Sequence, residues 1–531
     1  MPNKHFSDSS NTPNVFIQKH QEKIIGVLHG FDRLRFSGSL RALYHVPVMA
    51  EYLSKCKVLF KDFKGFALNI TAKIKAATQA LAEQAGRPIV YLPSSNSCKE
   101  DAALELARKD RIQSGLIAVL SCVENCRTYT VGGNPKTKHL DLQLKWGKCL
   151  HYYFYFLHPV FGLMHVRLQS WFPFLINVCL NGREWLARQM DRARLGYEQR
   201  DNCFAWVEDV SKAQRLLHRQ LRTRWPEELD KLLRQVHPTD QAIRRPMRLQ
   251  YYWTVCQSEY ATDVMFKSET ELEQLYPSLV HHGITSFQSP DVLRFLGYRP
   301  PQQGVGKFLG EVTSDYKRRP EGVRVKHSVD GNSIKIYDKQ GSVLRVETTI
   351  NRAEELKVYR AKETDPKGPK AWRELRRGVA DLPRRAQVSR AANERYLTSL
   401  AAVAPGEPLG REVDRLCQPV RKKGRRSRAL NPWAQKDARL LTAINRGEFV
   451  LNGFRNRDLR PLLSPGRHTV QETKRQAGII TRQLRLFRAH GLIKKIRGSH
   501  RYQLSKRGRR IIPALLAARN ADVDALTKLA A

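Results

Sequence analysis

The stretch 332–351, NSIKIYDKQGSVLRVETTIN, alternates apolar and polar residues on both sides of a short turn. Successive side chains of a strand point to opposite faces of a sheet, so this period of two predicts two antiparallel strands joined near Asp338–Gly341. The preceding segment repeats the pattern and contains a second turn at Asp330–Gly331. The sequence therefore predicts a three-stranded antiparallel meander within residues 301–360.

The same hairpin is densely charged and aromatic. Alternation places Lys335, Tyr337 and Lys339 on one face of its first strand, and Arg345 and Glu347 on one face of its second strand. Basic residues in this arrangement fit a sheet that faces nucleic acid, so Lys335, Lys339 and Arg345 are predicted to contact phosphates. The alternative is a charged and aromatic face that is simply solvated.

The rest of the chain indicates several domains, because 531 residues exceed what one hydrophobic core usually organises. Strand-like and helical segments alternate near the N-terminus, which favours an α/β core there. The prediction is a multi-domain α+β protein. Its expected parts are a disordered N-terminus (1–20), an α/β domain (21–148), a mixed, helix-rich domain (149–300), the meander (301–360), a basic helical and linker region (361–435) and a C-terminal domain (436–531).

The balance of charge indicates the class of partner. The chain holds 93 Lys and Arg against 50 Asp and Glu, a formal net charge of +43. Such an excess on folded domains repels itself and is usually offset by a polyanion, so DNA is the expected partner and RNA the alternative. A merely solubilising basic surface is the remaining explanation.

The sequence gives no indication of a membrane or of export. The first residues, MPNKHFSDSSNTPN, are polar, and the nine cysteines are scattered. The longest apolar stretch, residues 149–166, is interrupted by three histidines and a proline, which favours buried strands over a membrane span. We therefore expect a cytoplasmic, nucleoid-associated protein.

The C-terminal segment contains RNRDLRPLLSPG, then a long helical pattern with apolar Ile480, Leu484 and Phe487, and then HGLIKKIRGSHRYQLSKRGRR. This order of elements resembles a winged helix-turn-helix domain, which implies a recognition helix in the major groove and a wing along the backbone. Residues 421–531 hold 28 Lys and Arg against six Asp and Glu, which fits such a role. The expected DNA contacts are Arg482, Arg485 and Arg488 on the helix, and Lys494, Lys495, Arg497, His500 and Arg501 on the wing.

Two carboxylates suggest phosphodiester chemistry. Asp32 follows the strand-like IIGVL and Glu124 follows LIAVL, so both are predicted at neighbouring strand ends. Carboxylates in that arrangement hold Mg²⁺ or Mn²⁺ in RNase H-like nucleases and transposases, which makes Asp32 and Glu124 candidate metal ligands. An Asp–Arg pair in GFDRLRF is an equally good structural explanation for Asp32.

The segment KIYDKQGSVLRVE is similar to a Tyr-Asp-Lys, then Arg-x-Glu, pattern of rolling-circle and filamentous-phage replication initiators. The resemblance implies that Tyr337 or Tyr359 attacks a phosphate, that Lys339 and Arg345 stabilise charge, and that Glu347 helps to hold a metal. The sequence departs from that family because it contains no His-x-His metal motif.

Two further groups are candidates. Aromatic residues around His165 and Arg167 fit a single-strand binding surface, although most of them are expected in a core. A second group, Cys122, Cys126, Cys149 and His151, could hold zinc, but the spacing of its cysteines is loose.

Segments from GFDRLRFSGSLR to HGLIKKIRGSHRYQLSKRGRR resemble a family of long, uncharacterised bacterial proteins of mobile-element type. The sequence thus favours a DNA-binding protein with transposase- or recombinase-like phosphodiester transfer. A non-catalytic DNA-binding regulator, an RNA-binding protein and a replication-initiator-like nuclease stay open as alternatives.

Overall fold

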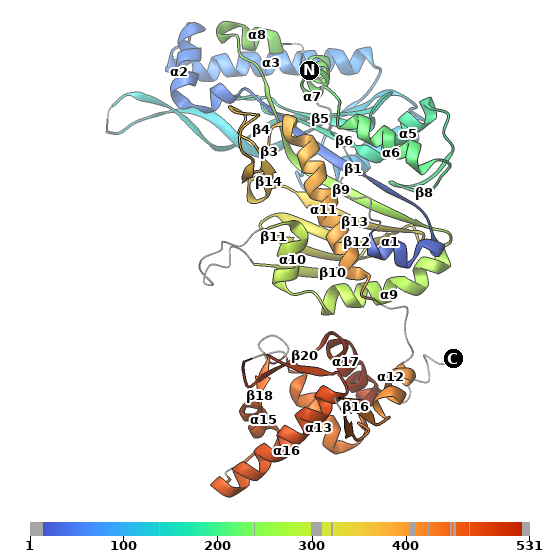
Figure 1. Cartoon of the computed structure of the whole chain (residues 1–531). Coiled ribbons are helices and arrows are strands. Elements are labelled where there is room, and N and C mark those ends of the chain that lie inside the picture. The colour runs from blue at the N-terminus through green and yellow to red at the C-terminus, as the bar shows by residue number, and fades with distance from the viewer. Residues whose placement is uncertain are drawn as a thin grey trace. The chain divides into compact units, whose positions relative to one another are not determined.

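The computed structural model describes residues 14–136, 138–237, 239–298, 311–319, 322–403, 409–422, 424–446, 449, 453–466, 468–496 and 498–522. The chain is a mixed α+β protein and divides into two compact units, residues 1–403 and 404–531 (Figure 1). Within the described part, no helix combines the length and the apolar character needed to cross a bilayer.

An eleven-stranded sheet organises the first unit, in the order β10-β11-β12-β13-β9-β1-β6-β5-β4-β3-β2. Neighbouring strands are antiparallel, except that β2 and β3 run parallel. The strands are β1 (Ile24–Ser39), β2 (Ile89–Tyr91), β3 (Gly115–Gly133), β4 (Leu140–His158), β5 (Gly162–Gln169), β6 (Ile176–Asn181), β9 (Tyr252–Phe266), β10 (Thr313–Arg319), β11 (Gly322–Val329), β12 (Asn332–Lys339) and β13 (Val343–Ile350).

This sheet crosses the domain borders expected at residues 148 and 300. Strand β4 spans the first border, and β9, from the region expected to be helix-rich, lies at the centre of the sheet beside β1. Four consecutive antiparallel strands, β10 to β13, stand where three were expected. A local pattern indicates a strand but does not identify its partner, which is why the borders differ.

The helices of the first unit are α1 (Val15–Lys19), α2 (Val46–Lys55), α3 (Phe63–Gln84), α4 (Lys99–Lys109), α5 (Gly182–Arg192), α6 (Val210–Gln220), α7 (Trp225–Val236), α8 (Asp240–Arg244), α9 (Glu269–Thr285), α10 (Ser289–Leu296) and α11 (Leu382–Leu400). Two ribbons complete it, β7 (Tyr197–Arg200) with β8 (Cys203–Val207), and β14 (Lys357–Arg360) with β15 (Ala371–Glu374).

Strands β12 and β13 have one apolar face and one polar face. Ile334, Ile336, Leu344 and Val346 are fully buried in a core that includes residues of α9, α10 and α11, and Figure 1 shows α11 lying across these strands. Burying each such side chain contributes roughly 1.5–3 kcal/mol. Because side chains alternate, the polar residues of both strands point to the opposite face, where the candidate site lies.

The second unit is a small helical domain with a three-stranded sheet in the order β18-β20-β19. Its elements are α12 (Leu409–Leu416), β16 (Val420–Lys422), β17 (Arg425–Ser427), α13 (Gln435–Ile444), β18 (Phe454–Arg455), α15 (Asn456–Leu463), α16 (Val470–Ala489), β19 (Ile493–Lys495), β20 (Arg501–Leu504) and α17 (Lys506–Asn520).

The long helix α16 has clear boundaries in the sequence. It begins with a capping box, in which Thr469 accepts from the Glu472 backbone N–H and the Glu472 carboxylate accepts from the Thr469 N–H. Gly491, with a φ of 75°, follows its end in the left-handed conformation that glycine adopts without strain. Ile480, Leu484 and Phe487 face the core of the unit, as their spacing predicts.

Candidate metal centre

Three carboxylates meet at the centre of the large sheet. Asp32 of β1, Glu259 of β9 and Glu347 of β13 each offer an oxygen, and the three oxygens lie within 4.8 Å of one another. The strand order β13-β9-β1 makes these residues neighbours although they are far apart in the sequence. Like charges this close repel, so such a grouping needs compensating positive charge or a proton nearby.

A β-bulge turns Asp32 toward this cluster. Phe31 pairs with Tyr260 and Arg33 pairs with Glu259, so Asp32 is the extra residue of β1 and has no partner on β9. Bulges re-aim side chains and are frequent beside active sites. On the next rung, Glu347 lies opposite Ala261, and Ala261 lies opposite Gly30. A Cβ at Gly30 would lie 2.8 Å from the Leu217 side chain, so this part of the sheet is closely packed.

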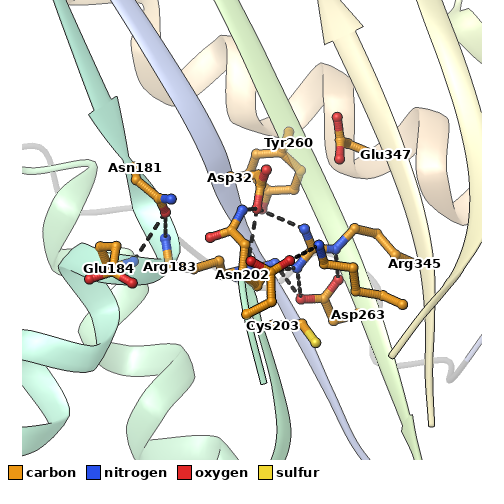
Figure 2. Close-up of polar contacts among 12 residues, drawn as sticks. Asp32, Asn181, Arg183, Glu184, Asn202, Cys203, Tyr260, Asp263, Arg345 and Glu347 are labelled. Atoms are coloured by element: carbon orange, nitrogen blue, oxygen red, sulfur yellow. Dashed lines mark hydrogen bonds and ion pairs between the residues drawn. The ribbon is translucent and has the colours of Figure 1, made fainter. Parts of the chain in front are cut away.

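Only one oxygen of Asp32 is engaged by the protein. Arg345 Nη1 and Asn202 Nδ2 each donate to Oδ1 over 2.8 Å, and Arg183 Nε lies 3.9 Å from the same oxygen (Figure 2). Among the described residues, Oδ2 has no hydrogen-bond or ion-pair partner. Asp32 is therefore held firmly while one oxygen is available for a ligand.

A buried ion cluster fixes this geometry. Asp263 accepts two hydrogen bonds from Arg345, of 2.6 and 2.8 Å, and lies 2.9 Å from Arg183 Nη2. All three side chains are 1% exposed or less. Asn181 Oδ1 accepts from the backbone N–H groups of Arg183 and Glu184 and so caps the start of α5, the helix that carries Arg183 (Figure 2). Two arginines balance two aspartates, which lowers the cost of burying the charges.

Glu347 is oriented by β12. Lys335 Nζ lies 2.7 Å from Glu347 Oε1, and the Tyr337 hydroxyl donates to Oε2 over 2.8 Å. Glu347 is fully buried, whereas the Lys335 side chain retains some exposure. Figure 2 shows Glu347 on the strand next to that of Asp263, beside the Asp32–Arg345 contacts.

Glu259 is held in the cluster by nearby charges and not by direct bonds. Within the described residues its carboxylate makes no hydrogen bond or ion pair and is only partly exposed, and the charges of Lys335 and Arg33 act to lower its pKa. Burial, followed by the nearby carboxylates of Glu347 and Asp32, raises the pKa of Glu259 to about 7. A perturbed carboxylate beside two others is typical of a functional site.

The donor set fits a hard divalent cation. Carboxylate oxygens are the ligands that Mg²⁺ and Mn²⁺ prefer, and the unengaged oxygen of Asp32 and the unpartnered Glu259 are both available. A bound cation would offset the repulsion that raises the pKa of Glu259. The arrangement is thus suited to metal binding.

Glu124, predicted as a co-ligand of Asp32, lies elsewhere on the sheet. Three strands separate β3 from β1, which places the two residues roughly 19 Å apart at about 4.8 Å per strand. Glu124 is paired with Lys99, Arg167 and the Tyr153 hydroxyl. Burial acts to raise the pKa of Glu124, but these three partners outweigh it, so that pKa is lowered.

The basic residues predicted to contact phosphate from the hairpin are engaged internally. Arg345 is 1% exposed and bonded to Asp32 and Asp263, so it cannot reach a phosphate. Lys339 is buried and ion-paired with Asp201. Lys335 keeps partial exposure but is paired with Glu347. The alternating pattern placed these side chains on one face correctly, but could not show that acidic strands lie beside them.

The two tyrosines predicted as nucleophiles differ in environment. Tyr337 is 6% exposed, its hydroxyl donates to Glu347, and burial raises the pKa of that hydroxyl well above its ordinary value. Tyr359 is 58% exposed, but lies on β14, in a separate two-stranded ribbon. Neither hydroxyl is arranged as an activated nucleophile.

Three residues of the site were missed in the sequence. Glu259 and Asp263 lie in YYWTVCQSEYATDVMF, where Gln257, Glu259 and Asp263 recur on one face of a strand. This period of two was present but was interpreted as part of a helix-rich region. Arg183 carried no local signal, because its role depends on contacts across the fold.

In the second unit, most predicted DNA contacts lie on the surface. The side chains of Arg482, Arg485 and Arg488 on α16, of Lys494 and Lys495 on β19, and of His500 are exposed, and Arg501 is partly exposed. Arg497 lies outside the described residues.

Comparisons of the chain with models of protein families, with curated proteins and with solved structures give no match.

Proposed function

We propose that this chain is a DNA-binding enzyme that cleaves or transfers phosphodiester bonds with Mg²⁺ or Mn²⁺, in the manner of the transposases and recombinases of mobile elements. The observation that carries the proposal is the meeting of Asp32, Glu259 and Glu347 in an otherwise strongly basic protein. Acidic clusters that hold a metal are the usual way in which proteins cleave phosphodiesters.

Each residue has a defined part in this proposal. Asp32, Glu259 and Glu347 hold the cation, which when bound polarises the phosphate and lowers the pKa of a water molecule. Lys335, paired with Glu347 and partly exposed, stabilises negative charge on the phosphate. Asp263, Arg345 and Arg183 are positioning residues, since they hold Asp32 without reaching solvent.

Water is the favoured nucleophile. Tyr337 is buried and hydrogen-bonded to a proposed metal ligand, so it supports the position of Glu347 instead of attacking a phosphate. The replication-initiator alternative needs a tyrosine hydroxyl that is free to reach the substrate. The environment of Tyr337 does not favour it.

In this proposal, nucleic acid approaches the carboxylates along β1. After Asp32, this strand continues with Arg33 and Arg35, of which Arg35 is exposed and Arg33 is partly exposed. Arg35 pairs across the sheet with Cys179, which pairs with His165. The His165 ring lies 4.8 Å from that of Tyr155, and burial, then Arg35, lowers the pKa of His165 to about 3, so this histidine belongs to the packed part of the sheet.

The second unit supplies the anchoring part of the proposal, as a winged helix. Its order α13-β18-α15-α16-β19-β20 corresponds to the helix–strand–helix–helix–strand–strand order of that domain, and its sheet order β18-β20-β19 supports the same assignment. Helix α16 would then enter the major groove, and the β19–β20 hairpin would be the wing. A non-catalytic DNA-binding regulator is the second candidate, because this unit alone would suffice for it.

The test is cleavage of labelled supercoiled, linear and single-stranded DNA with Mg²⁺ or Mn²⁺, with RNA of the same sequence as the comparison substrate. We expect the wild-type chain to nick DNA, and Asp32→Asn, Glu259→Gln and Glu347→Gln to lower the rate at least about 100-fold. Glu124→Gln is the matched control, since it removes a carboxylate from the same sheet outside the cluster, and it should retain activity.

Wild-type protein that binds DNA tightly and salt-sensitively, but cleaves no DNA form with either cation, would exclude the enzyme and leave the regulator. Cleavage that survives all three substitutions would place the chemistry elsewhere. Preferential binding and cleavage of the RNA would favour the RNA-binding alternative.

A further inference from the structure

Two thiols and an imidazole meet on the hairpin of β3 and β4. Cys126 lies on β3, Cys149 and His151 lie on β4, and their ligand atoms are all within 4.8 Å of one another. The two sulfurs are 3.2 Å apart, and Cys149 Sγ lies 4.0 Å from His151 Nδ1. Cys126 and His151 are buried, whereas Cys149 is partly exposed and gives access to the group.

The two sulfurs are close to the spacing of a zinc site. With Zn–S near 2.3 Å and Zn–N near 2.0–2.1 Å, tetrahedral ligands lie roughly 3.5–3.8 Å from one another. The 3.2 Å between Cys126 Sγ and Cys149 Sγ falls just short of that range, and one nitrogen of His151 lies within 4.8 Å of both sulfurs. Movement of the three side chains would bring their ligand atoms onto one ion.

The register argues against a disulfide between the same cysteines. Cys126 pairs with Gly147 and Cys149 pairs with Glu124, so the two cysteines are diagonal neighbours and not directly opposite. Diagonal neighbours on antiparallel strands are roughly 7–8 Å apart, whereas the Cα atoms of a disulfide usually lie within about 6.8 Å. The register therefore favours a shared ion over a disulfide.

The imidazole provides the second, independent observation. His151 is fully buried, and its Nδ1 lies 3.1 Å from the Cys149 carbonyl oxygen, which suits Nδ1–H as the donor. The other nitrogen, Nε2, then carries the lone pair, and it is buried without a hydrogen-bond partner. Metal-binding histidines typically donate one ring N–H to a backbone carbonyl and use the other nitrogen as the ligand.

We propose that Cys126, Cys149 and His151 bind a zinc ion that fastens β3 to β4. Both thiols lose their protons to solvent on binding, so two thiolates and a neutral imidazole form an uncharged complex with Zn²⁺. Water completes the coordination at the partly exposed side of Cys149. The soft sulfur ligands separate this site from the carboxylate cluster, whose oxygen ligands select Mg²⁺ or Mn²⁺.

The site has a structural role in this proposal. Strands β3 and β4 are both 19 residues long and form the longest hairpin of the described sheet. The zinc ion would fix their register at the Glu124–Cys149 pair, and Glu124 is itself ion-paired with Lys99 and Arg167. Loss of the ion should loosen this end of the sheet without removing the carboxylate cluster.

The first test measures metal content of the full-length chain, purified without a metal-affinity step and dialysed with excess Mg²⁺ to fill oxygen sites. We expect about one zinc per wild-type chain by mass spectrometry of the elements, and almost none in Cys126→Ser, Cys149→Ser or His151→Gln. Cys98→Ser is the matched control, because Cys98 is an exposed cysteine outside the cluster, and it should keep the zinc.

A second measurement remains decisive if a variant folds poorly. Cobalt-loaded wild-type protein should absorb in the near ultraviolet through thiolate-to-metal charge transfer, which carboxylate ligands cannot produce. Glu347→Gln should keep this band.

Alkylation of the cysteines in the absence of reductant separates zinc from a disulfide. Cys126 and Cys149 of the wild-type protein should react with the alkylating reagent only after a chelator has removed the metal. If the two cysteines react only after reduction, they form a disulfide and the proposal is wrong. Zinc-free wild-type protein without the cobalt band would overturn it as well.

Discussion

The basic residues of the β12–β13 hairpin and those of α16 look alike in sequence but have opposite roles in the structure. Arg345 is 1% exposed and bonded to two aspartates, whereas Arg482 and Arg485 are exposed on their helix. Arg345 is an internal part of the sheet, whereas Arg482 and Arg485 are available to a partner. A local excess of charge therefore indicates a binding surface only where no acidic strand lies beside it.

The largest expected effect separates these two groups directly. Arg345→Met leaves Asp32 and Asp263 buried with Arg183 alone, and should cost roughly 3–5 kcal/mol of the free energy of unfolding of the first unit. Arg482→Met should change stability by less than about 0.5 kcal/mol. Urea unfolding followed by circular dichroism measures both. The double variant Arg345→Met with Asp263→Leu should recover part of the lost stability. If Arg345→Met and Arg482→Met were equally stable, the comparison would be wrong.

Two glycines give a second contrast. A Cβ on Gly182 would lie 1.8 Å from the Phe31 carbonyl oxygen, so Gly182→Ala should displace α5 and Arg183 and cost roughly 2–3 kcal/mol. A Cβ on Gly478 of α16 meets only the end of the Arg482 side chain, at 3.7 Å, so Gly478→Ala should stabilise its helix by about 0.5–1 kcal/mol. Thermal unfolding of both variants checks this. Stabilisation by Gly182→Ala would show that the close approach is not real.

The pH dependence of Glu259 has a definite sign. Because its pKa in the folded chain, about 7, exceeds the ordinary value of 4.5, the folded state binds the proton more tightly. Stability without metal should therefore fall as pH rises from about 4.5 to 7, and at pH 8 Glu259→Gln should be more stable than wild type by roughly 2 kcal/mol.

Added Mn²⁺ should reverse that order, because the ionised carboxylate is the ligand and only wild type keeps it. The measurement is the melting temperature at pH 5 and pH 8, with EDTA and with Mn²⁺. Glu124→Gln is the control, since the lowered pKa of Glu124 predicts a loss of stability at pH 8. The difference in melting temperature between wild type and Glu259→Gln in EDTA should change between pH 5 and pH 8. A constant difference would contradict the raised pKa of Glu259.

The smallest effect on stability belongs to the exposed arginines of α16. Arg482→Ala and Arg485→Ala should leave unfolding within about 0.5 kcal/mol of wild type. Each should nevertheless weaken DNA binding and reduce the slope of log affinity against log salt by about 1 if it contacts a phosphate. Titration by fluorescence anisotropy at several salt concentrations measures this. Unchanged slopes for both variants would remove α16 from the proposed interface.

The parts of the fold and site that the sequence predicted are those set by neighbouring residues. The strands around 332–351 follow from alternation, and the boundaries of α16 follow from Thr469, Glu472 and Gly491. These predictions needed no knowledge of a distant partner. Asp32 was a candidate ligand because it follows an apolar run, and Glu347 only through the resemblance to replication initiators, so the meeting of the two was not predicted.

The remainder depended on pairing between distant segments. Asp32 was matched with Glu124 because both follow apolar runs, but the sheet order puts three strands between them. Glu259 completes the cluster only because β9 lies between β1 and β13, from a segment interpreted as helix-rich. The burial of Arg345 likewise depends on Asp263, 82 residues earlier in the chain. No pattern within one segment contains that information.

The bulge at Asp32 also makes β1 sensitive to its length. Before the bulge the odd-numbered residues His29 and Phe31 pair with Thr262 and Tyr260, and after it the even-numbered Leu34 pairs with Ser258. One extra residue thus shifts the phase of the strand at mid-length. Deleting one residue between the two halves would remove this shift and turn the residues that follow to the other face of the sheet. The strand should therefore tolerate no change in residue number between Phe31 and Leu34.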